Sequence, residues 1–232
     1  MPTISGIIVS TGTESAGRRA FSDIVDELAR PYDASDTTIR ALAGDAFRAA
    51  VRTLNRKGLW PWEVLDEDIT LTANIDKYTL SGPVKKPLAM HYLSASGGVR
   101  DQSIGYVPYD RFLEEYNLNV TGTACLYTIP NLFETGQVQF WPIPSGADNV
   151  RFSYYRVTPA PRSDTETVEI PDYALEAYMA YAWLELSKRL PAAQARYPLN
   201  IAMAEARLAF RELSAHVPGV SDRSRQSMGR GY

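Results

Sequence analysis

Apolar residues near the start of the chain recur every three or four positions, which is the spacing of an amphipathic helix. This pattern predicts a helix over residues 18–30, which Pro31 ends because proline lacks the backbone N–H that a helix needs. A second, longer apolar stripe predicts a helix from Asp36, whose side chain can cap the first turn, to about Lys57. The chain therefore begins with helices after a short polar arm.

Between residues 64 and 170 the pattern changes to alternation of apolar and polar positions, which is typical of half-buried strands. The segment 137–155 has alternating runs on both sides of a proline-rich turn and is predicted to form a hairpin. Further hairpins are predicted around 74–76 and 97–98, with a short helix over 109–117. This part of the chain has the size of a small sandwich or barrel.

Helical spacing returns at Pro171 and resumes after Pro198. The order of helices, strands and helices predicts an α+β fold, in which a helical bundle carries an inserted β-rich domain that resembles a sandwich or barrel, with extended termini. The predicted segments are a flexible N-terminal arm (1–17), N-terminal helices (18–63), a β-rich domain (64–170), C-terminal helices (171–217) and an extended C-terminal tail (218–232).

The composition of the 232-residue chain is that of an ordinary folded protein, with 45% hydrophobic and 22% charged residues. Its formal net charge of -3 disfavours extensive coating of nucleic acid. The single cysteine, Cys125, excludes an intrachain disulfide and is predicted to be a small buried residue. No apolar run has the ~20 residues of a membrane helix, and no signal peptide is recognisable, so we expect a soluble protein made in a cytoplasm.

Motifs that carry enzymatic chemistry are absent or incomplete. The stretch IIVSTGTESAGRR has the glycine spacing of a phosphate-binding P-loop, but Arg18 and Arg19 replace the lysine and the hydroxyl residue that contact phosphate and magnesium. Two distant histidines and one cysteine cannot form a zinc site of the usual composition. We therefore expect no enzymatic activity, no cofactor and no metal site.

Two groups of side chains are candidates for intermolecular contacts. Four arginines recur along the second predicted helix: Arg40, Arg48, Arg52 and Arg56. They form either a solvated face, ion pairs with a neighbouring subunit or contacts with nucleic acid. In the segment 137–155, Trp141 and Tyr155 fall outside the core pattern and bind either a ligand or a neighbouring copy.

Trp60 and Trp62 are expected to pack where helices give way to strands, with at least one of them buried.

The order and spacing of these signals resemble those of bacteriophage head-to-tail adaptor proteins, also called head-completion or connector proteins. The stretch LNRKGLWPWEVLDEDITLTANIDKYTL is similar to the step from helix through a tryptophan-bearing junction to strands in that family. LYTIPNLFETGQVQFWPIPSGADNVRFSYYRVTPAP resembles its central strands, and VEIPDYALEAYMAYAWLELSKRLP resembles its return to helix. The resemblance spans roughly residues 36–191, and none of its motifs is catalytic.

The resemblance implies a structural virion protein at the portal vertex or neck, assembled in the host cytoplasm without a membrane. Its copies form a homo-oligomeric ring, of about twelve subunits, that connects the capsid portal to tail or nozzle proteins and lets DNA pass. The four arginines then contact another subunit or the DNA channel, and Trp141 and Tyr155 contact a neighbour or the tail. The C-terminal region of this family docks on the portal, which assigns that contact to Arg223, Arg225, Arg230 and Tyr232.

The principal alternative is a carbohydrate-binding β module with helical appendages, because exposed Trp and Tyr side chains on a sheet can stack on sugars. The long N-terminal helices and the lack of a recognisable secretion signal argue against it. An unrecognised hydrolase is a third class. Mass measurement separates the three, since only the adaptor is required to form rings.

Overall fold

The computed structural model describes residues 19–33, 35–94, 97–190 and 198–216. Within them the chain divides into two compact units. The β unit comprises Glu63–Val157, and the helical unit combines the chain before and after it. The sequence interpretation ended the β-rich part at residue 170, whereas the structure places Val168 and Ile170 in the core of the helical unit.

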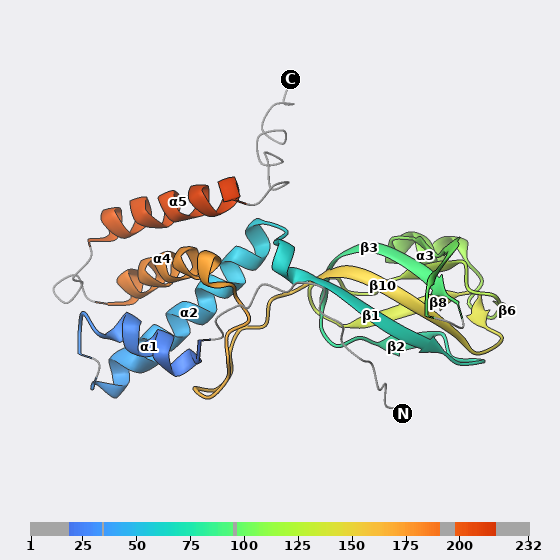
Figure 1. The fold of residues 1–232 in the computed structure, drawn as a ribbon, viewed down its shortest axis with the longest axis horizontal. Coiled ribbons are helices and arrows are strands. Elements are labelled where there is room, and N and C mark those ends of the chain that lie inside the picture. Colours follow the sequence, from blue (N-terminus) through green and yellow to red (C-terminus); the bar gives the residue numbers. More distant parts are fainter. Residues whose placement is uncertain (1–18, 34, 95–96, 191–197, 217–232) are drawn as a thin grey trace, which may run out of the picture. The chain divides into compact units, whose positions relative to one another are not determined.

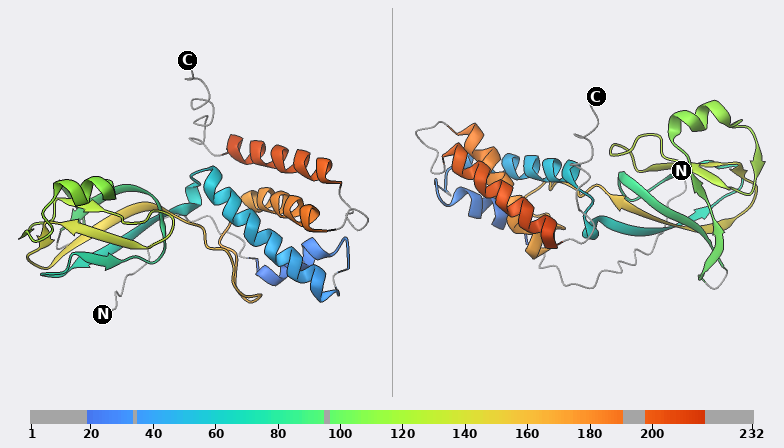
Figure 2. Two further views of the ribbon diagram at one scale, coloured as in Figure 1. Left: turned by 180° about the vertical axis from the view of Figure 1, so that it is seen from behind. Right: turned by 90° about the horizontal axis from the view of Figure 1, so that it is seen from above.

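Among the described residues, the helical unit contains four α-helices: α1 (Phe21–Ala29), α2 (Thr37–Lys57), α4 (Asp172–Arg189) and α5 (Leu199–His216). Helix α4 packs between α2 and α5, and α1 packs against α2 and α4 (Figures 1 and 2). The predicted cap is confirmed, because the Asp36 carboxylate accepts hydrogen bonds from the backbone N–H groups of Thr38 at 2.7 Å and Ile39 at 3.4 Å. These bonds satisfy donors that the first turn of α2 leaves without helical partners.

The tryptophans after α2 belong to this unit. Trp60 is fully buried, and its Nε1 donates to the Leu54 carbonyl oxygen at 3.1 Å. Its ring stacks on that of the half-buried Trp62, with centroids 5.3 Å apart, and meets Phe210 of α5 edge-on. The expectation that at least one of the two tryptophans is buried is therefore confirmed. The short helix η1, Pro61–Glu63, follows and leads into the first strand.

The described part of the β unit consists of strands and one α-helix, α3 (Tyr109–Glu115), between β5 and β6. The strands are β1 (Val64–Leu71), β2 (Lys77–Thr79), β3 (Val84–Leu93), β4 (Val99–Ser103), β5 (Gly105–Tyr106), β6 (Thr121–Gly122), β7 (Leu126–Thr128), β8 (Gln137–Trp141), β9 (Ile143–Pro144) and β10 (Asp148–Arg156). One sheet has the strand order β1-β10-β3-β4, a second has the order β2-β8-β7-β5, and β6 pairs with β9.

Both four-stranded sheets contribute to one apolar core. Phe152 of β10 in the first sheet meets Tyr127 of β7 in the second, with ring centroids 5.4 Å apart. Phe140 of β8 and Tyr154 of β10 are buried in the same cluster. The unit is therefore a sandwich of two open sheets, and the predicted α+β class is confirmed.

The predicted hairpin over 137–155 is wrong in its pairing. Strand β8 pairs with β2 and β7, whereas β10 pairs with β1 and β3 in the other sheet. Pro142 and Pro144 supply no N–H donors to the connection, so a continuous two-stranded ladder cannot run through it. The same correction applies to the hairpin expected at 74–76, because β1 and β2 also lie in different sheets. Alternating runs reveal strands, but they do not reveal which strands pair.

Other local predictions for the β unit have mixed outcomes. The hairpin around 97–98 is confirmed by antiparallel pairing of β3 with β4, and α3 confirms the short helix. The expected burial of Cys125 is wrong, since its side chain is exposed. Its neighbours Ala124 and Tyr127 are the buried residues of that stretch, and Cys125 is left facing solvent.

Candidate functional site

The four arginines of α2 do not share one environment. Each step of four residues advances an α-helix by about 40° beyond a full turn, so the row winds around α2 instead of following one side. Arg40 is half-buried and forms an ion pair with Asp26 of α1. Arg48 donates from Nε to the Pro161 carbonyl oxygen at 2.8 Å, and its guanidinium lies 4.9 Å from the centre of the Phe21 ring. These two arginines hold the helical unit together.

Arg52 and Arg56 lie further along the winding row and are exposed. Neither forms an ion pair with any other residue that the structure describes. The neighbouring Lys57, by contrast, donates to the Tyr181 hydroxyl of α4 at 2.6 Å. Of the cations along this part of α2, Arg52 and Arg56 are therefore the two available for an intermolecular contact.

Trp141 and Tyr155 lie on strands of different sheets, β8 and β10. Trp141 is half-buried, its Nε1 donates to the Asn117 carbonyl oxygen at 2.8 Å, and its ring centre lies 4.8 Å from that of Tyr116. It thus fixes the segment that follows α3. Tyr155 is half-buried on β10, in register with Val64 of β1. The two aromatics are not neighbours on one hairpin, so each has to be tested as a separate contact.

The predicted portal contacts Arg223, Arg225, Arg230 and Tyr232 lie outside the described residues, as does Arg18 of the N-terminal arm. Among the residues that are described, no three His, Cys, Asp or Glu side chains are placed to hold a metal ion together. Within the same ranges, no helix is both long enough and apolar enough to span a membrane.

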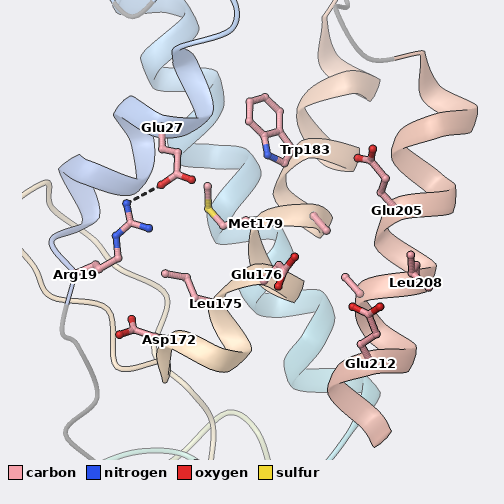
Figure 3. Close-up of a pocket in the computed structure, with 12 residues that line it drawn as sticks. Arg19, Glu27, Asp172, Leu175, Glu176, Met179, Trp183, Glu205, Leu208 and Glu212 are labelled. Atoms are coloured by element: carbon pink, nitrogen blue, oxygen red, sulfur yellow. Dashed lines mark hydrogen bonds and ion pairs between the residues drawn. The ribbon is translucent and has the colours of Figure 1, made fainter. Parts of the chain in front are cut away.

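The helical unit contains a groove that the sequence analysis did not predict. It has a volume of ≈ 740 Å³ and lies beside α4, between α1 and α5 (Figure 3). Its floor is apolar and is formed by Leu175, Met179, Ala180, Trp183, Leu208 and Ala209. Leu208 of α5 remains 56% exposed, so this floor is open to solvent. A floor of this kind is suited to an apolar or partly apolar group.

Acidic side chains surround the floor of the groove: Glu27, Asp172, Glu176, Glu205 and Glu212. Arg19 offsets one of them, through an ion pair with Glu27 at 2.6 Å that Figure 3 marks. Asp172, Glu176 and Glu205 have no ion-pair partner among the described residues. The groove therefore combines negative charge at its rim with an apolar floor.

A sequence signal for this groove exists on α5. Ile201, Glu205, Leu208 and Glu212 follow one another at helical spacing, so apolar and acidic side chains share one side of the helix. A solvated helix side is usually polar, and a core side is usually apolar. A mixed side is typical of neither and marks a surface that a partner can cover.

A buried ion pair lies in the β unit, between Lys85 of β3 and Glu63 of η1. The Lys85 Nζ is 2.7 Å from Glu63 Oε2, and the two side chains are 2% and 0% exposed. Burial lowers the pKa of Lys85, and the Glu63 carboxylate opposes this shift. Because solvent does not reach either charge, we interpret the pair as a structural element rather than a binding site.

In a comparison with known proteins, the family model described as SU10 adaptor protein matches residues 19–230. One similar solved chain comes from the virion of a native gene transfer agent particle, with 15% identity, coverage of 88% of this chain and 94% of that chain, and a TM-score of 0.30. Another comes from the neck of an empty gene transfer agent particle, with 15% identity, coverage of 89% and 95%, and a TM-score of 0.29. No curated protein matches the chain.

Proposed function

The chain belongs to the SU10 adaptor protein family, and we propose that it is a structural virion protein at the neck, between the capsid portal and the tail. In this proposal, copies of the chain form a ring that connects the portal to tail or nozzle proteins, and DNA passes through the ring. The family match carries the proposal, because it spans residues 19–230 and so includes both units. The proposal includes the absence of enzymatic turnover and of a tightly bound metal or nucleotide. Saturable ATP binding that Arg18→Ala abolishes would contradict that part.

Charge on the helical unit supports contacts between copies or with DNA. The exposed Arg52 and Arg56 are free to meet acids of a neighbouring subunit or phosphates in the channel. The formal net charge of -3 suits a conduit, since a strongly basic channel would bind the passing polymer tightly. In this proposal Arg40 and Arg48 act indirectly, by holding α1 and the Pro161 segment against α2.

The aromatics of the β unit are proposed to contact a neighbouring copy or a tail protein. Interfaces concentrate Trp, Tyr and Arg at their energetic centres. Trp141→Ala and Tyr155→Ala together are expected to leave the chain folded but to weaken assembly. Because Trp141 also fixes the segment after α3, Asn117→Ala serves as a control. It removes the Asn117 Oδ1 that accepts from the Asn119 N–H at 3.0 Å and so loosens the segment, while the indole and its backbone acceptor stay in place. Unchanged assembly of the double variant would remove both residues from the interface, and specific sugar binding would favour the carbohydrate-binding alternative.

The C-terminal tail is proposed to contact the portal. Its three arginines, Arg223, Arg225 and Arg230, suit acidic grooves on a partner, and such a contact weakens as salt screens the charges. Deleting residues 219–232 is expected to leave both units folded and to abolish attachment to the portal. A truncated chain that attaches as well as the full chain would show that the tail is dispensable.

The test of the whole proposal is assembly with the portal protein of the same virion. The chain is examined alone and mixed with portal, by sedimentation velocity and by electron microscopy of the same samples. We expect rings, either in solution or seated on the portal. A chain that stays monomeric in both conditions would contradict the proposed function.

A further inference from the structure

We propose that the groove beside α4 receives the side chains of Arg52 and Arg56 from the α2 helix of a neighbouring copy. This inference rests on the proposed function, because it names the contact between copies that a ring needs. It follows from three observations on the helical unit: the chemistry of the groove, the two exposed arginines, and the placement of both on the same unit.

The groove has the chemistry that recognises an arginine. An arginine side chain buries its methylene stem along apolar surface while its guanidinium stays polar. For such a stem the groove offers Leu208, which is 56% exposed, and the half-buried Ala180 and Ala209. The guanidinium is planar, stacks on aromatic faces and binds carboxylates through paired hydrogen bonds. The groove provides an aromatic ring in Trp183, and it provides carboxylates in Glu176 and Glu205 (Figure 3).

The exposed arginines of α2 match the two carboxylates in number and in charge. Arg52 and Arg56 are four residues apart on one helix, which places their Cβ atoms about 5–6 Å from each other. The helix fixes this separation, so two guanidinium groups approach a partner together without the cost of ordering a flexible segment. Two unpaired carboxylates, Glu176 on α4 and Glu205 on α5, face them as complementary charges.

A single copy cannot make this contact with itself. Helix α2 packs against the side of α4 that carries Tyr181, whose hydroxyl accepts the Lys57 hydrogen bond. The groove lies along the side of α4 that carries Met179 and Trp183, and α2 runs behind α4 in Figure 3. Because α2 is held on that far side of α4, its exposed arginines reach a groove only in another copy. A contact between two different surfaces is head-to-tail, and such contacts generate rings when the rotation closes.

Exchange of the charges tests this pairing. Arg52→Glu with Arg56→Glu makes one double variant, and Glu176→Arg with Glu205→Arg makes the other; all four residues are exposed. We expect each variant to keep the wild-type circular dichroism spectrum and melting temperature, and to need a roughly tenfold or higher concentration to form rings. A mixture of the two variants restores assembly, because each α2 then meets a groove of opposite charge. The chain that carries all four substitutions restores it as well.

A milder pair of variants guards against misfolding. Arg52→Gln with Arg56→Gln, and Glu176→Gln with Glu205→Gln, remove charge without reversing it and are expected to weaken assembly by a smaller factor. Sedimentation velocity, with and without portal, measures the ring fraction for every variant. The arginines of the C-terminal tail are the competing occupant of the groove. Repeating the Glu176→Arg and Glu205→Arg substitutions in a chain that lacks residues 219–232 therefore shows whether the arginines of α2 or those of the tail occupy the groove.

The outcomes are distinct. If wild-type chain forms rings and the reversed variants form them equally well, the pairing is wrong and the proposed function stands. If the mixture and the fourfold variant fail to restore rings, the losses are not due to this charge pair, and the pairing is also wrong. If the groove reversal loses its effect in the chain without residues 219–232, the tail occupies the groove instead of α2. If wild-type chain forms no ring alone or on portal, the proposed function itself fails.

Discussion

The helical unit and the β unit fill their cores with side chains of different sizes. The helical core includes many alanines: Ala43, Ala46, Ala50, Ala174, Ala177, Ala182 and Ala206. The β core is rich in aromatic residues, namely Tyr78, Tyr92, Tyr127, Phe140, Phe152 and Tyr154. Small residues let helix backbones approach closely, whereas large rings fill the space between two sheets. The alanine positions of the helical core are therefore sensitive to added volume, and the ring positions of the β core to lost volume.

The tyrosines of the β core also tie its loops to its sheets. The Tyr92 hydroxyl donates to the Ala124 carbonyl oxygen at 2.7 Å, and the Tyr78 hydroxyl accepts from the Thr72 N–H at 2.7 Å. The Tyr154 hydroxyl bonds Glu67 Oε2 at 2.9 Å, and burial raises the pKa of Tyr154 above its ordinary value. The ring of each tyrosine serves packing while its hydroxyl satisfies a polar group at the edge of the core.

Trp60 sharpens this comparison, because it heads the fully buried side chains by volume and lies in the alanine-rich core, beside smaller rings such as Phe47 and Tyr178. Trp60→Ala removes a fully buried side chain and a hydrogen bond to Leu54, and we expect a loss of ~3–5 kcal/mol in the free energy of unfolding. Trp62→Ala is the matched control with a smaller expected loss, since Trp62 is only half-buried. Denaturant unfolding measures both. Equal and small losses would mean that the alanine-rich core closes around the cavity.

A comparable loss is expected in the β unit from the buried ion pair. Glu63→Gln leaves the Lys85 ammonium without its charged partner, which costs ~3–5 kcal/mol where solvent cannot reach. The control is Asp68→Asn in the same unit, which breaks the Arg151–Asp68 pair at 2.7 Å. That pair is more than one-third exposed, so its loss is expected to cost no more than ~1 kcal/mol. Similar melting temperatures for the two variants would show that the β unit tolerates an unpaired buried charge.

Features that depend on nearby residues could be predicted from the sequence, whereas features that depend on contacts between distant residues could not. The helix α2 and its Asp36 cap depend on residues within one turn or one periodic stripe, and these predictions are confirmed. The strands β8 and β10 are also visible as alternating runs, but their partners lie far away in the sequence and cannot be read from alternation. The hairpin predicted from their proximity was wrong for that reason.

For the candidate sites, too, the sequence displays local features but not the contacts between distant residues. The four arginines of α2 are visible in the sequence, yet only the packing of α1 and the Pro161 segment separates Arg40 and Arg48 from the two exposed ones. The groove needs α1, α4 and α5 together, and its residues come from positions 19 to 212. No local pattern contains that arrangement. The mixed apolar and acidic side of α5 is the one part of it that a sequence displays.

Added volume is the direct test of the alanine-rich core. Ala50 of α2 is fully buried, and Ala50→Leu forces extra methylene groups between packed helices, for an expected loss of ~1–3 kcal/mol. Ala41→Leu is the matched control, because Ala41 lies on the exposed side of the same helix and Leu is nearly as good a helix former as Ala. Thermal unfolding compares the two variants. If Ala50→Leu melts at the wild-type temperature, the helical core has free space and the contrast with the β core fails.

The smallest expected effect concerns the start of α2, where stability comes from backbone hydrogen bonds and not from core volume. Asp36→Ala removes the acceptor for the N–H groups of Thr38 and Ile39, and such caps contribute ~0.5–2 kcal/mol. Asp36→Ser keeps an acceptor at the same position and is expected to remain close to wild type. Hydrogen exchange is the sharper measurement, because loss of the cap frays the first turn of α2 while the amides near Ala50 stay protected. If Ala and Ser behave alike in both unfolding and exchange, the packing of α1 and α4 holds the end of α2 without the cap.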